Sequence, residues 1–265
     1  MQLTSTYLNN MFVAHFHPKK SLGQNFLTNP HIVEKIIETA SLMGGETVVE
    51  IGPGFGILTE ELLKRAKKVI AIEKDARLFE ILREKFKDQI DSGKLELIHA
   101  DALRIPPPNE PYAWIANIPY SITSPLLDHF IRENPSNLPT RSVLLVQKEV
   151  AQKLCAKPPR MNVLALHVQT FGDPEIVADV SRANFKPAPK VDSAIIKIDF
   201  PKTPKTPELK TKTDYEKYFA LIHKAFSQKR KMLRRTLPKE LLEKAGIDPT
   251  RRPETLTLKE WAKLV

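Results

Sequence analysis

Residues Asn117–Tyr120 have the sequence Asn-Ile-Pro-Tyr and follow an apolar run, Tyr112–Ala116, that predicts a β-strand. The asparagine carboxamide oxygen can accept a hydrogen bond from an amino group, and the proline fixes the direction of the neighbouring backbone carbonyl. The tyrosine ring offers a flat face to another planar ring. At the carboxyl end of a strand, this combination is suited to holding an exocyclic amine on an aromatic base. The candidate catalytic residues are therefore Asn117, Ile118, Pro119 and Tyr120.

A glycine-rich turn, Gly52–Gly56, lies between an apolar strand that begins at Thr47 and a helix predicted over Ile57–Ala66. A strand, a glycine turn and a helix in this order are the layout of nucleotide-binding sites, because glycines let backbone N–H groups come close to a ligand. A second strand, Lys68–Ile72, ends on Glu73, at about the spacing where an acidic side chain holds the ribose hydroxyls. A glycine turn by itself is often only a tight turn, but this context favours a nucleotide site.

Further strands predict an α/β fold in which polar residues gather at one edge. Asp101 follows a third strand, Leu95–His99, and is either an acceptor for an adenine amino group or a cap of the next turn. Strands that alternate with helices predict a parallel sheet covered on both faces, with ligands at the carboxyl ends of the strands. Gly52, Glu73, Asp101 and Asn117 would then converge. The remaining strands are expected at Ser142–Val146, Ile176–Val180 and Ala194–Phe200, which gives seven, and further helices are expected from Pro30, capped by Asn29, and over Asp75–Ile90.

The composition limits the classes of protein to which the chain can belong. It has 265 residues, 42% apolar and 27% charged, as is ordinary for a globular protein with one sizeable core and a smaller appended unit. The single cysteine, Cys155, excludes an internal disulfide and favours a reducing compartment, and no cysteine or histidine has metal-site spacing. No apolar run approaches the ~20 residues of a membrane span, and residues 1–16 lack the basic start of a secretory signal. We expect a cytoplasmic protein with no metal and no membrane anchor.

The net charge of +10 is concentrated at the C-terminal end. Residues 1–200 contain 24 Lys and Arg against 23 Asp and Glu, whereas residues 201–265 contain 17 against 8. Such a basic unit favours a polyanionic partner, most often nucleic acid, with a solubilising tail as the alternative. After a linker at residues 201–213, helices are predicted over Tyr215–Phe226, Gln228–Arg235, Leu237–Ala245 and Leu258–Leu264. The second of these carries the candidate RNA-binding residues Lys229, Arg230, Lys231, Arg234 and Arg235.

Two segments outside the predicted sheet carry further candidates. Lys19–Leu27 has neither a helical nor a strand period, so it is interpreted as an arm that is either a flexible tail or a binding segment. The loop Asn184–Lys190 is stiffened by two prolines and presents Phe185, which is either a second wall for a planar ring or a core residue. The expected division is an arm at residues 1–29, a sheet domain at 30–200, the linker at 201–213 and a basic helical domain at 214–265.

These residues resemble known families. The turn Glu50–Gly56, with Glu73 and Asp101, resembles the class I S-adenosylmethionine-dependent methyltransferases, whose fold is a Rossmann-like seven-stranded sheet, and Asn117–Tyr120 resembles their signature for methylating an exocyclic base amine. Phe55 departs from the smaller residue usual in that turn. The combination as a whole resembles the small-subunit (16S) ribosomal RNA adenine dimethyltransferases from about Lys19 onward, through the motifs Ser21–Leu27, Asn117–Tyr120, Phe185–Ser193, Phe226–Leu233 and Arg252–Leu256.

The resemblance implies a substrate, a cofactor and a role for each candidate. The product would be two adjacent N6,N6-dimethyladenosines near the 3′ end of 16S ribosomal RNA, made by a monomer that acts on the small ribosomal subunit during its biogenesis. The methyl donor, S-adenosylmethionine, would be held by Asn25, Leu27, Gly52, Gly54, Glu73, Asp101 and Asn117. The Asn117 side chain and the Ile118 carbonyl would accept hydrogen bonds from adenine N6, while Tyr120 and Phe185 would stack on the base.

Three alternatives remain at this point. A large-subunit ribosomal RNA adenine methyltransferase of the antibiotic-resistance type would share the arm and Asn117–Tyr120, although Gln228–Leu233 and Arg252–Leu256 favour the small-subunit family. A nicotinamide-dependent dehydrogenase would share the glycine turn and Glu73 but leaves Asn117–Tyr120 unexplained. A non-catalytic RNA-binding assembly factor on the same scaffold would not need the intact motifs.

Overall fold

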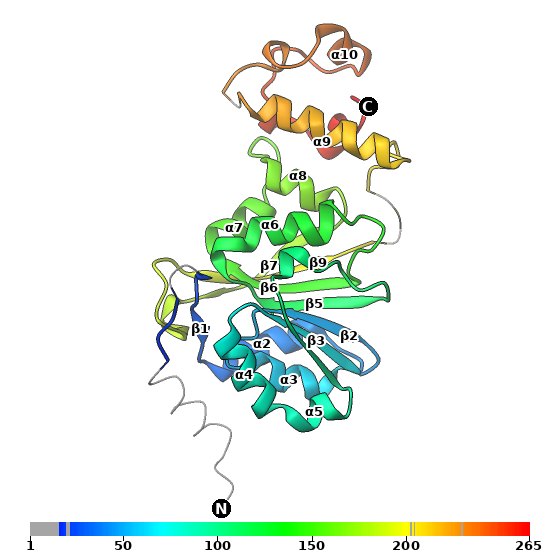
Figure 1. The fold of residues 1–265 in the computed structure, drawn as a ribbon. Coiled ribbons are helices and arrows are strands. Elements are labelled where there is room, and N and C mark those ends of the chain that lie inside the picture. Colours follow the sequence, from blue (N-terminus) through cyan, green and yellow to red (C-terminus); the bar gives the residue numbers. More distant parts are fainter. Residues whose placement is uncertain (1–15, 20–21, 202, 204, 229) are drawn as a thin grey trace, which may run out of the picture.

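The computed structural model describes residues 16–19, 22–201, 203, 205–228 and 230–265. Its centre is a seven-stranded sheet in which β2 (Thr47–Ile51) lies between β3 (Lys68–Glu73) and β5 (Tyr112–Asn117) (Figure 1). The full order is β4-β3-β2-β5-β6-β9-β7, with β4 at Leu95–His99, β6 at Arg141–Gln147, β7 at Asp173–Val180 and β9 at Ser193–Asp199. All seven strands predicted from the sequence are present.

The direction of one strand differs from the expectation. The pairs from β4 to β6 are parallel, but β9 is antiparallel to both β6 and β7. The sheet is therefore mixed. The cause is the connection between β7 and β9, which contains no helix of the crossover kind that a parallel pair needs, only a 3-10 turn at Arg182–Asn184 and the short strand β8 (Phe185–Lys186).

Side chains that alternate along each central strand enter two separate cores. In β5, Trp114 packs on one face against Phe130, with ring centroids 4.8 Å apart, while Ile115 enters the core on the other face. Both residues are fully buried, which is the pattern of a strand covered on both sides. The face of Ile115 is covered by α2 (Pro30–Ala40), α3 (Ile57–Arg65) and α4 (Ala76–Lys85), and the face of Trp114 by α6 (Thr123–Leu127), a π-helical turn (Asp128–Arg132), α7 (Lys148–Leu154) and α8 (Val163–Gln169).

The helix expected over residues 75–90 is two helices. It breaks at Phe86, which ends α4 and begins α5 (Lys87–Asp91). The Phe86 ring is buried and lies under the glycine turn, where a Cβ on Gly56 would come within 2.6 Å of it. Packing of this ring under the turn thus overrides the continuous helical period of the sequence.

The arm interpreted as aperiodic contains a short strand. β1 (Phe26–Leu27) pairs antiparallel with β8, so Leu27 lies opposite Phe185. Beyond the strand, the Thr28 N–H donates to the Asn184 carbonyl at 2.9 Å, and the Asn29 and Asn184 carboxamides are 2.7 Å apart. A strand of two residues is too short to show a period of two, so this pairing could not be predicted from the residue pattern.

The C-terminal helices share a core with the sheet unit. Tyr218 of α9 (Lys212–Phe226) is fully buried, and its hydroxyl accepts a hydrogen bond from Thr170 after α8 at 3.2 Å. Part of the expected linker is also packed, because Thr206 and Leu209 are buried and α9 begins at Lys212 with a capping box from Thr211. The remaining helices are α10 (Lys239–Lys244) and α11 (Leu258–Ala262), with a 3-10 turn at Pro253–Thr255 between them.

The prediction of a basic helix over Gln228–Arg235 is wrong. The chain turns after α9 and forms only a 3-10 turn at Leu233–Arg235. Leu233 is fully buried, its N–H donates to the Arg251 carbonyl at 2.8 Å, and the Arg234 N–H donates to the Pro249 carbonyl at 3.0 Å. These long-range partners replace the i−4 carbonyls of a helix. Within the described residues, no helix is long and apolar enough to cross a membrane.

Candidate active site

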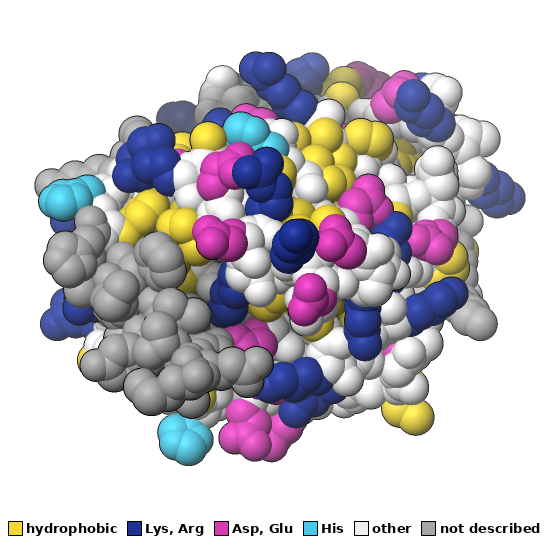
Figure 2. All heavy atoms as spheres, turned by 60° about the horizontal axis from the view of Figure 1, so that its bottom comes forward, with side chains coloured by type: hydrophobic (Ala, Val, Ile, Leu, Met, Phe, Trp, Pro, Cys, Tyr) yellow, Lys and Arg dark blue, Asp and Glu magenta, His cyan; other side chains and the backbone are white. Residues whose placement is uncertain are grey.

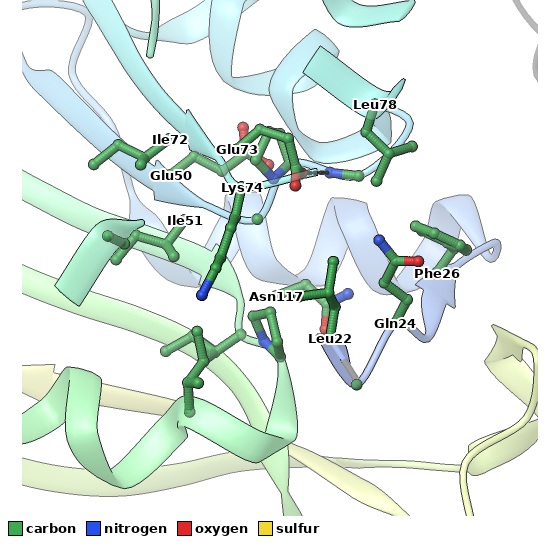
Figure 3. A pocket seen from close by; sticks show the side chains of 18 of the residues that line it. Leu22, Gln24, Phe26, Glu50, Ile51, Ile72, Glu73, Lys74, Leu78 and Asn117 are labelled. Carbon is green, nitrogen blue, oxygen red and sulfur yellow. Dashed lines mark hydrogen bonds between the residues drawn. The ribbon is translucent and has the colours of Figure 1, made fainter. Parts of the chain in front are cut away.

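The carboxyl ends of four neighbouring strands surround a cavity of about 150 Å³. Gly52, Glu73, Asp101 and Asn117 all line it, as expected from their places at the ends of strands. Figure 3 shows Glu73 and Asn117 among the lining side chains. The arm contributes Asn25, Phe26 and Leu27 to the lining, and residues 118–120 also line the cavity. The cavity thus contains every predicted donor-binding residue.

The glycine turn follows β2 and is shaped by two close approaches. Gly52 and Gly54 have φ angles of 68° and 62°, a region that favours glycine. A Cβ on Gly52 would meet the Pro119 ring at 3.3 Å, and a Cβ on Gly54 would meet the Phe26 ring at 3.1 Å. These glycines therefore allow both the Asn117–Tyr120 segment and the arm to approach the same turn.

Glu73 links the glycine turn to the next helix. Its two carboxylate oxygens accept hydrogen bonds from the N–H groups of Asp75, at 2.8 Å, and Gly54, at 3.4 Å. The residue is 5% exposed, and burial raises the pKa of this carboxyl while the backbone N–H groups act in the opposite direction. The backbone bonds hold the carboxylate in the orientation from which it faces the cavity.

Asp101 caps a turn and also lines the cavity. Its Oδ1 caps the 3-10 turn at Ala102–Arg104 by accepting from the Leu103 N–H at 3.2 Å, and the residue also lines the cavity. Its Oδ2 accepts from Lys74 Nζ at 2.8 Å, and this ammonium lowers the pKa of the carboxyl. Sequence reasoning missed Lys74, whose only signal is its position directly after Glu73.

The Asn117–Tyr120 segment is fixed on three sides. The Ile118 N–H donates to the Leu145 carbonyl at 3.1 Å, which continues the β5–β6 ladder past Asn117, and Pro119 lies against Gly52. The Tyr120 hydroxyl is 2.5 Å from Ser193 Oγ at the start of β9, and burial raises the pKa of this phenol. The Asn117 carboxamide, by contrast, makes no hydrogen bond to any residue in the part of the chain that the structure describes. Its polar atoms remain available to a ligand.

Phe185 is a core residue, which is one of the two interpretations that the sequence left open. It is 4% exposed, pairs with Leu27 through β1 and β8, and does not line the cavity. Its ring lies edge-on to Tyr120, with centroids 6.4 Å apart and an interplanar angle of 70°. In this position Phe185 supports Tyr120 instead of presenting a free face of its own.

Glu50 is a buried acidic residue. In the sequence it was noted only as the first residue of the Glu50–Gly56 motif and had no role of its own. It is 1% exposed at the floor of the cavity and accepts a hydrogen bond from Thr59 Oγ1 at 2.7 Å. Burial, partly offset by Thr59, raises the pKa of this carboxyl to about 8. Burial therefore favours the protonated form of Glu50 near neutral pH, whereas Glu73 has two backbone N–H donors to its carboxyl oxygens.

The described side chains of the predicted RNA-binding residues have fewer contacts than those that line the cavity. Arg230, Lys231, Arg234 and Arg235 are exposed, and none of them forms an ion pair with a described carboxylate. Lys229 lies outside the described residues. Figure 2 shows the opposite end of the molecule, where basic and acidic side chains are interspersed. The described residues contain no cluster of His, Cys, Asp and Glu suited to a metal ion.

Comparison with known proteins gives consistent matches over nearly the whole chain. The profile of the family described as ribosomal RNA adenine dimethylase matches residues 15–265. A protein of Dehalococcoides mccartyi named ribosomal RNA small subunit methyltransferase A is 42% identical, over 93% of this chain and 87% of its own. A protein of the same name from Enterococcus faecalis is 38% identical, over 94% and 90%.

Two solved structures share the fold at more than 25% identity. A dimethyladenosine transferase from Plasmodium falciparum is 30% identical with a TM-score of 0.74, over 90% of this chain and 95% of its own. The 23S rRNA methyltransferase ErmE is 31% identical with a TM-score of 0.71, over 91% and 98%. The chain is thus similar to enzymes that are named for either ribosomal subunit.

Proposed function

Because this chain belongs to the ribosomal RNA adenine dimethylase family, we propose that it dimethylates N6 of two adjacent adenosines near the 3′ end of 16S ribosomal RNA. The observation that carries the proposal is the Asn117 carboxamide, which has no described hydrogen-bond partner and lies where the strand ends converge. It acts on the small ribosomal subunit, as a single chain in the cytoplasm. The division into an arm, a catalytic domain, a linker and a basic helical domain is part of the same proposal.

The cavity fits S-adenosylmethionine, the methyl donor that this family implies. Gly52 and Gly54 have no side chain to keep a ligand away from the turn, and their N–H groups donate to the Ile72 carbonyl and to Glu73. Glu73 faces the cavity with its carboxylate oriented by these backbone bonds. A carboxylate suits ribose hydroxyls, and Asp101 suits an adenine amino group. Asn25 and Leu27 of the arm enclose the ligand from the other side. The donor supplies an electrophilic methyl group on a sulfonium, which is already a good leaving group.

The chain's own residues position the nucleophile. The lone pair of adenine N6 is delocalised into the ring, and hydrogen bonds from N6 to Asn117 Oδ1 and to the Ile118 carbonyl localise it toward the methyl group. Alignment of this kind can lower the barrier by several kcal/mol, up to about 10. No strong general base is required, because the N6 proton becomes acidic as N6 is methylated.

Tyr120 provides the stacking face for the target base. Its hydroxyl is held by Ser193 and its ring is supported by the edge of Phe185, so the face that remains is rigid. Removing the target base from its own stack costs a few kcal/mol. Stacking on an aromatic side chain returns about 1–3 kcal/mol of this.

The basic residues after α9 supply contacts to phosphates. Arg230, Lys231, Arg234 and Arg235 are exposed on a turn that the buried Leu233 holds against the loop of Arg251, and the proposal includes Lys229, outside the described residues. Such contacts give affinity that falls steeply with salt and carry no sequence information. Recognition of the shape of the RNA substrate supplies the specificity.

Labelled donor and unmethylated ribosomal subunits test the substrate. We expect label in small-subunit RNA and, by mass spectrometry, two adjacent dimethyladenosines near its 3′ end. Label confined to the large subunit would instead favour the activity named for the ErmE structure. Nicotinamide binding in a titration without donor binding would favour a dehydrogenase, and absence of label in either subunit a non-catalytic assembly factor.

A further inference from the structure

The arm is fastened beside the donor cavity by one buried carboxylate. Asp75 lies two residues after Glu73, where it caps α4 by accepting from the Arg77 N–H at 3.2 Å. Its side chain is fully buried, yet it does not line the cavity. Besides the Arg77 guanidinium, its side chain has partners on the arm, which is more than fifty residues away in the sequence. A cap of α4 alone would not need them.

Two arm residues donate to this carboxylate. Gln24 Nε2 donates to Asp75 Oδ2 at 2.9 Å, and Lys19 Nζ is 3.4 Å from Oδ1. Gln24 Oε1 in turn accepts from the Lys19 N–H at 2.7 Å, so the two arm residues are also tied to each other. Gln24 itself lines the donor cavity, and in Figure 3 it lies across the cavity from Glu73.

Arg77 completes the attachment. Its Nε and Nη2 atoms are 3.0 and 2.6 Å from the two Asp75 oxygens, while its Nη1 donates to the His17 carbonyl at 3.1 Å. The guanidinium also lies 4.3 Å from the centre of the Phe16 ring, which contacts Phe26 and Phe55 edge-on. One ion pair therefore joins the start of α4, the arm and the aromatic residues beside the glycine turn.

We propose that Asp75 is a positioning residue that holds the arm closed over the donor cavity. It thereby sets the rate at which S-adenosylmethionine and S-adenosylhomocysteine dissociate. The proposal rests on the proposed function, because it assumes that the cavity binds the donor. The Asp75 N–H also donates to Glu73, so the same residue organises both walls of the cavity. Closing the arm and orienting the proposed ribose-binding carboxylate are thereby coupled.

Asp75→Asn tests this with little disturbance of α4, because asparagine is an equally good N-cap. Loss of a charged hydrogen-bond acceptor should raise the dissociation rate of S-adenosylmethionine and S-adenosylhomocysteine about tenfold. KM for the donor should rise while kcat does not fall, and trypsin should cut faster beside Lys19. Asp173→Asn, which removes a paired aspartate at the start of β7, is the matched control and should change none of these.

Gln24→Glu and the double variant separate fastening of the arm from a merely structural role. Gln24→Glu places two carboxylates together and should release the arm as Asp75→Asn does. In the double variant the hydrogen bond between positions 24 and 75 is restored with donor and acceptor exchanged, so donor dissociation should be slower than in either single variant. Unchanged dissociation and cleavage in both single variants, or additive loss in the double variant, would overturn the proposal. Absence of donor binding by the wild-type chain would instead overturn the proposed function.

Discussion

The two ends of this molecule use ionisable residues in opposite ways. At the sheet edge, Glu50, Glu73 and Asp75 are almost entirely buried and each has a fixed set of donors. At the C-terminal end, Arg230, Lys231 and Arg234 are exposed and have no ion-pair partner among the described residues. The first arrangement suits a small ligand that must be held in one orientation. The second suits a large polyanion whose phosphates are contacted one by one.

This difference between the sheet edge and the C-terminal end predicts that mutations at the two ends have effects of unequal size. A buried group that is removed leaves its partners unsatisfied, which costs about 1–3 kcal/mol. An exposed cation contributes an interaction that salt screens. A single substitution at the sheet edge should therefore reduce activity or donor binding strongly. A single substitution at the C-terminal end should reduce RNA affinity only slightly, and several together are needed for a large loss.

The largest effect is expected for Asn117→Ala. It removes the acceptor that aligns N6 and should lower kcat by about 10²–10³, as the loss of one preorganised hydrogen-bonding group does elsewhere. Donor and RNA binding should fall far less than kcat, because the other donor-binding residues remain and the backbone at Asn117 continues a strand. Single-turnover methylation with equilibrium binding measures both. Full activity in this variant would discard the mechanism.

Glu50→Gln should change how stability depends on pH. The carboxyl has an ordinary pKa of 4.5 when unfolded and about 8 when folded, so between these values only the unfolded chain loses the proton. Rising pH therefore destabilises the wild type, by about 1.4 kcal/mol per pH unit at most, and stability levels off above pH 8. Glutamine does not ionise and can still accept from Thr59. The advantage of the variant should thus grow from pH 5.5 to pH 7.5 in urea unfolding, and parallel curves would contradict the assignment.

These differences also explain what could be predicted from the sequence. The seven strands and the convergence of Gly52, Glu73, Asp101 and Asn117 were predictable, because each strand is a local apolar run and each of these residues stands at the carboxyl end of a strand. The break at Phe86, the β1–β8 pair and the turn at Leu233 were not. Each depends on a partner distant in the sequence: the Gly56 turn, Asn184 or Arg251.

The residues that line the site could be predicted from the sequence, but the contacts that hold them in place could not. Tyr120 was visible as an aromatic residue in a motif, whereas the bond to Ser193 and the edge contact with Phe185 required the fold. The same holds for Asp75, whose sequence position indicates only a helix cap. Residues that would touch a ligand belong to local motifs, and residues that hold them in place do not.

Glu73→Gln should weaken donor binding by about tenfold or more, since it replaces one acceptor oxygen that faces the cavity with an amide donor. Glutamine also places an NH₂ group against the N–H of Asp75 or Gly54. Isothermal titration with S-adenosylhomocysteine gives the affinity. Glu61→Gln is the matched control, because Glu61 pairs with Lys64 and Arg65 on α3 and does not line the cavity. This variant should bind the donor normally.

The smallest effect is expected for Arg234→Ala combined with Arg235→Ala. Both side chains are exposed, and the backbone bond from Arg234 to Pro249 does not need either of them, so the fold should be unchanged. Affinity for ribosomal RNA should fall only a few-fold, but the slope of log K against log salt should decrease by about 1 for each phosphate that the variant no longer neutralises. A matched pair, Lys64→Ala with Arg83→Ala, removes two cations from the catalytic unit and should leave the slope unchanged. Equal slopes for the two double variants would mean that the C-terminal end holds RNA no differently from the rest of the surface.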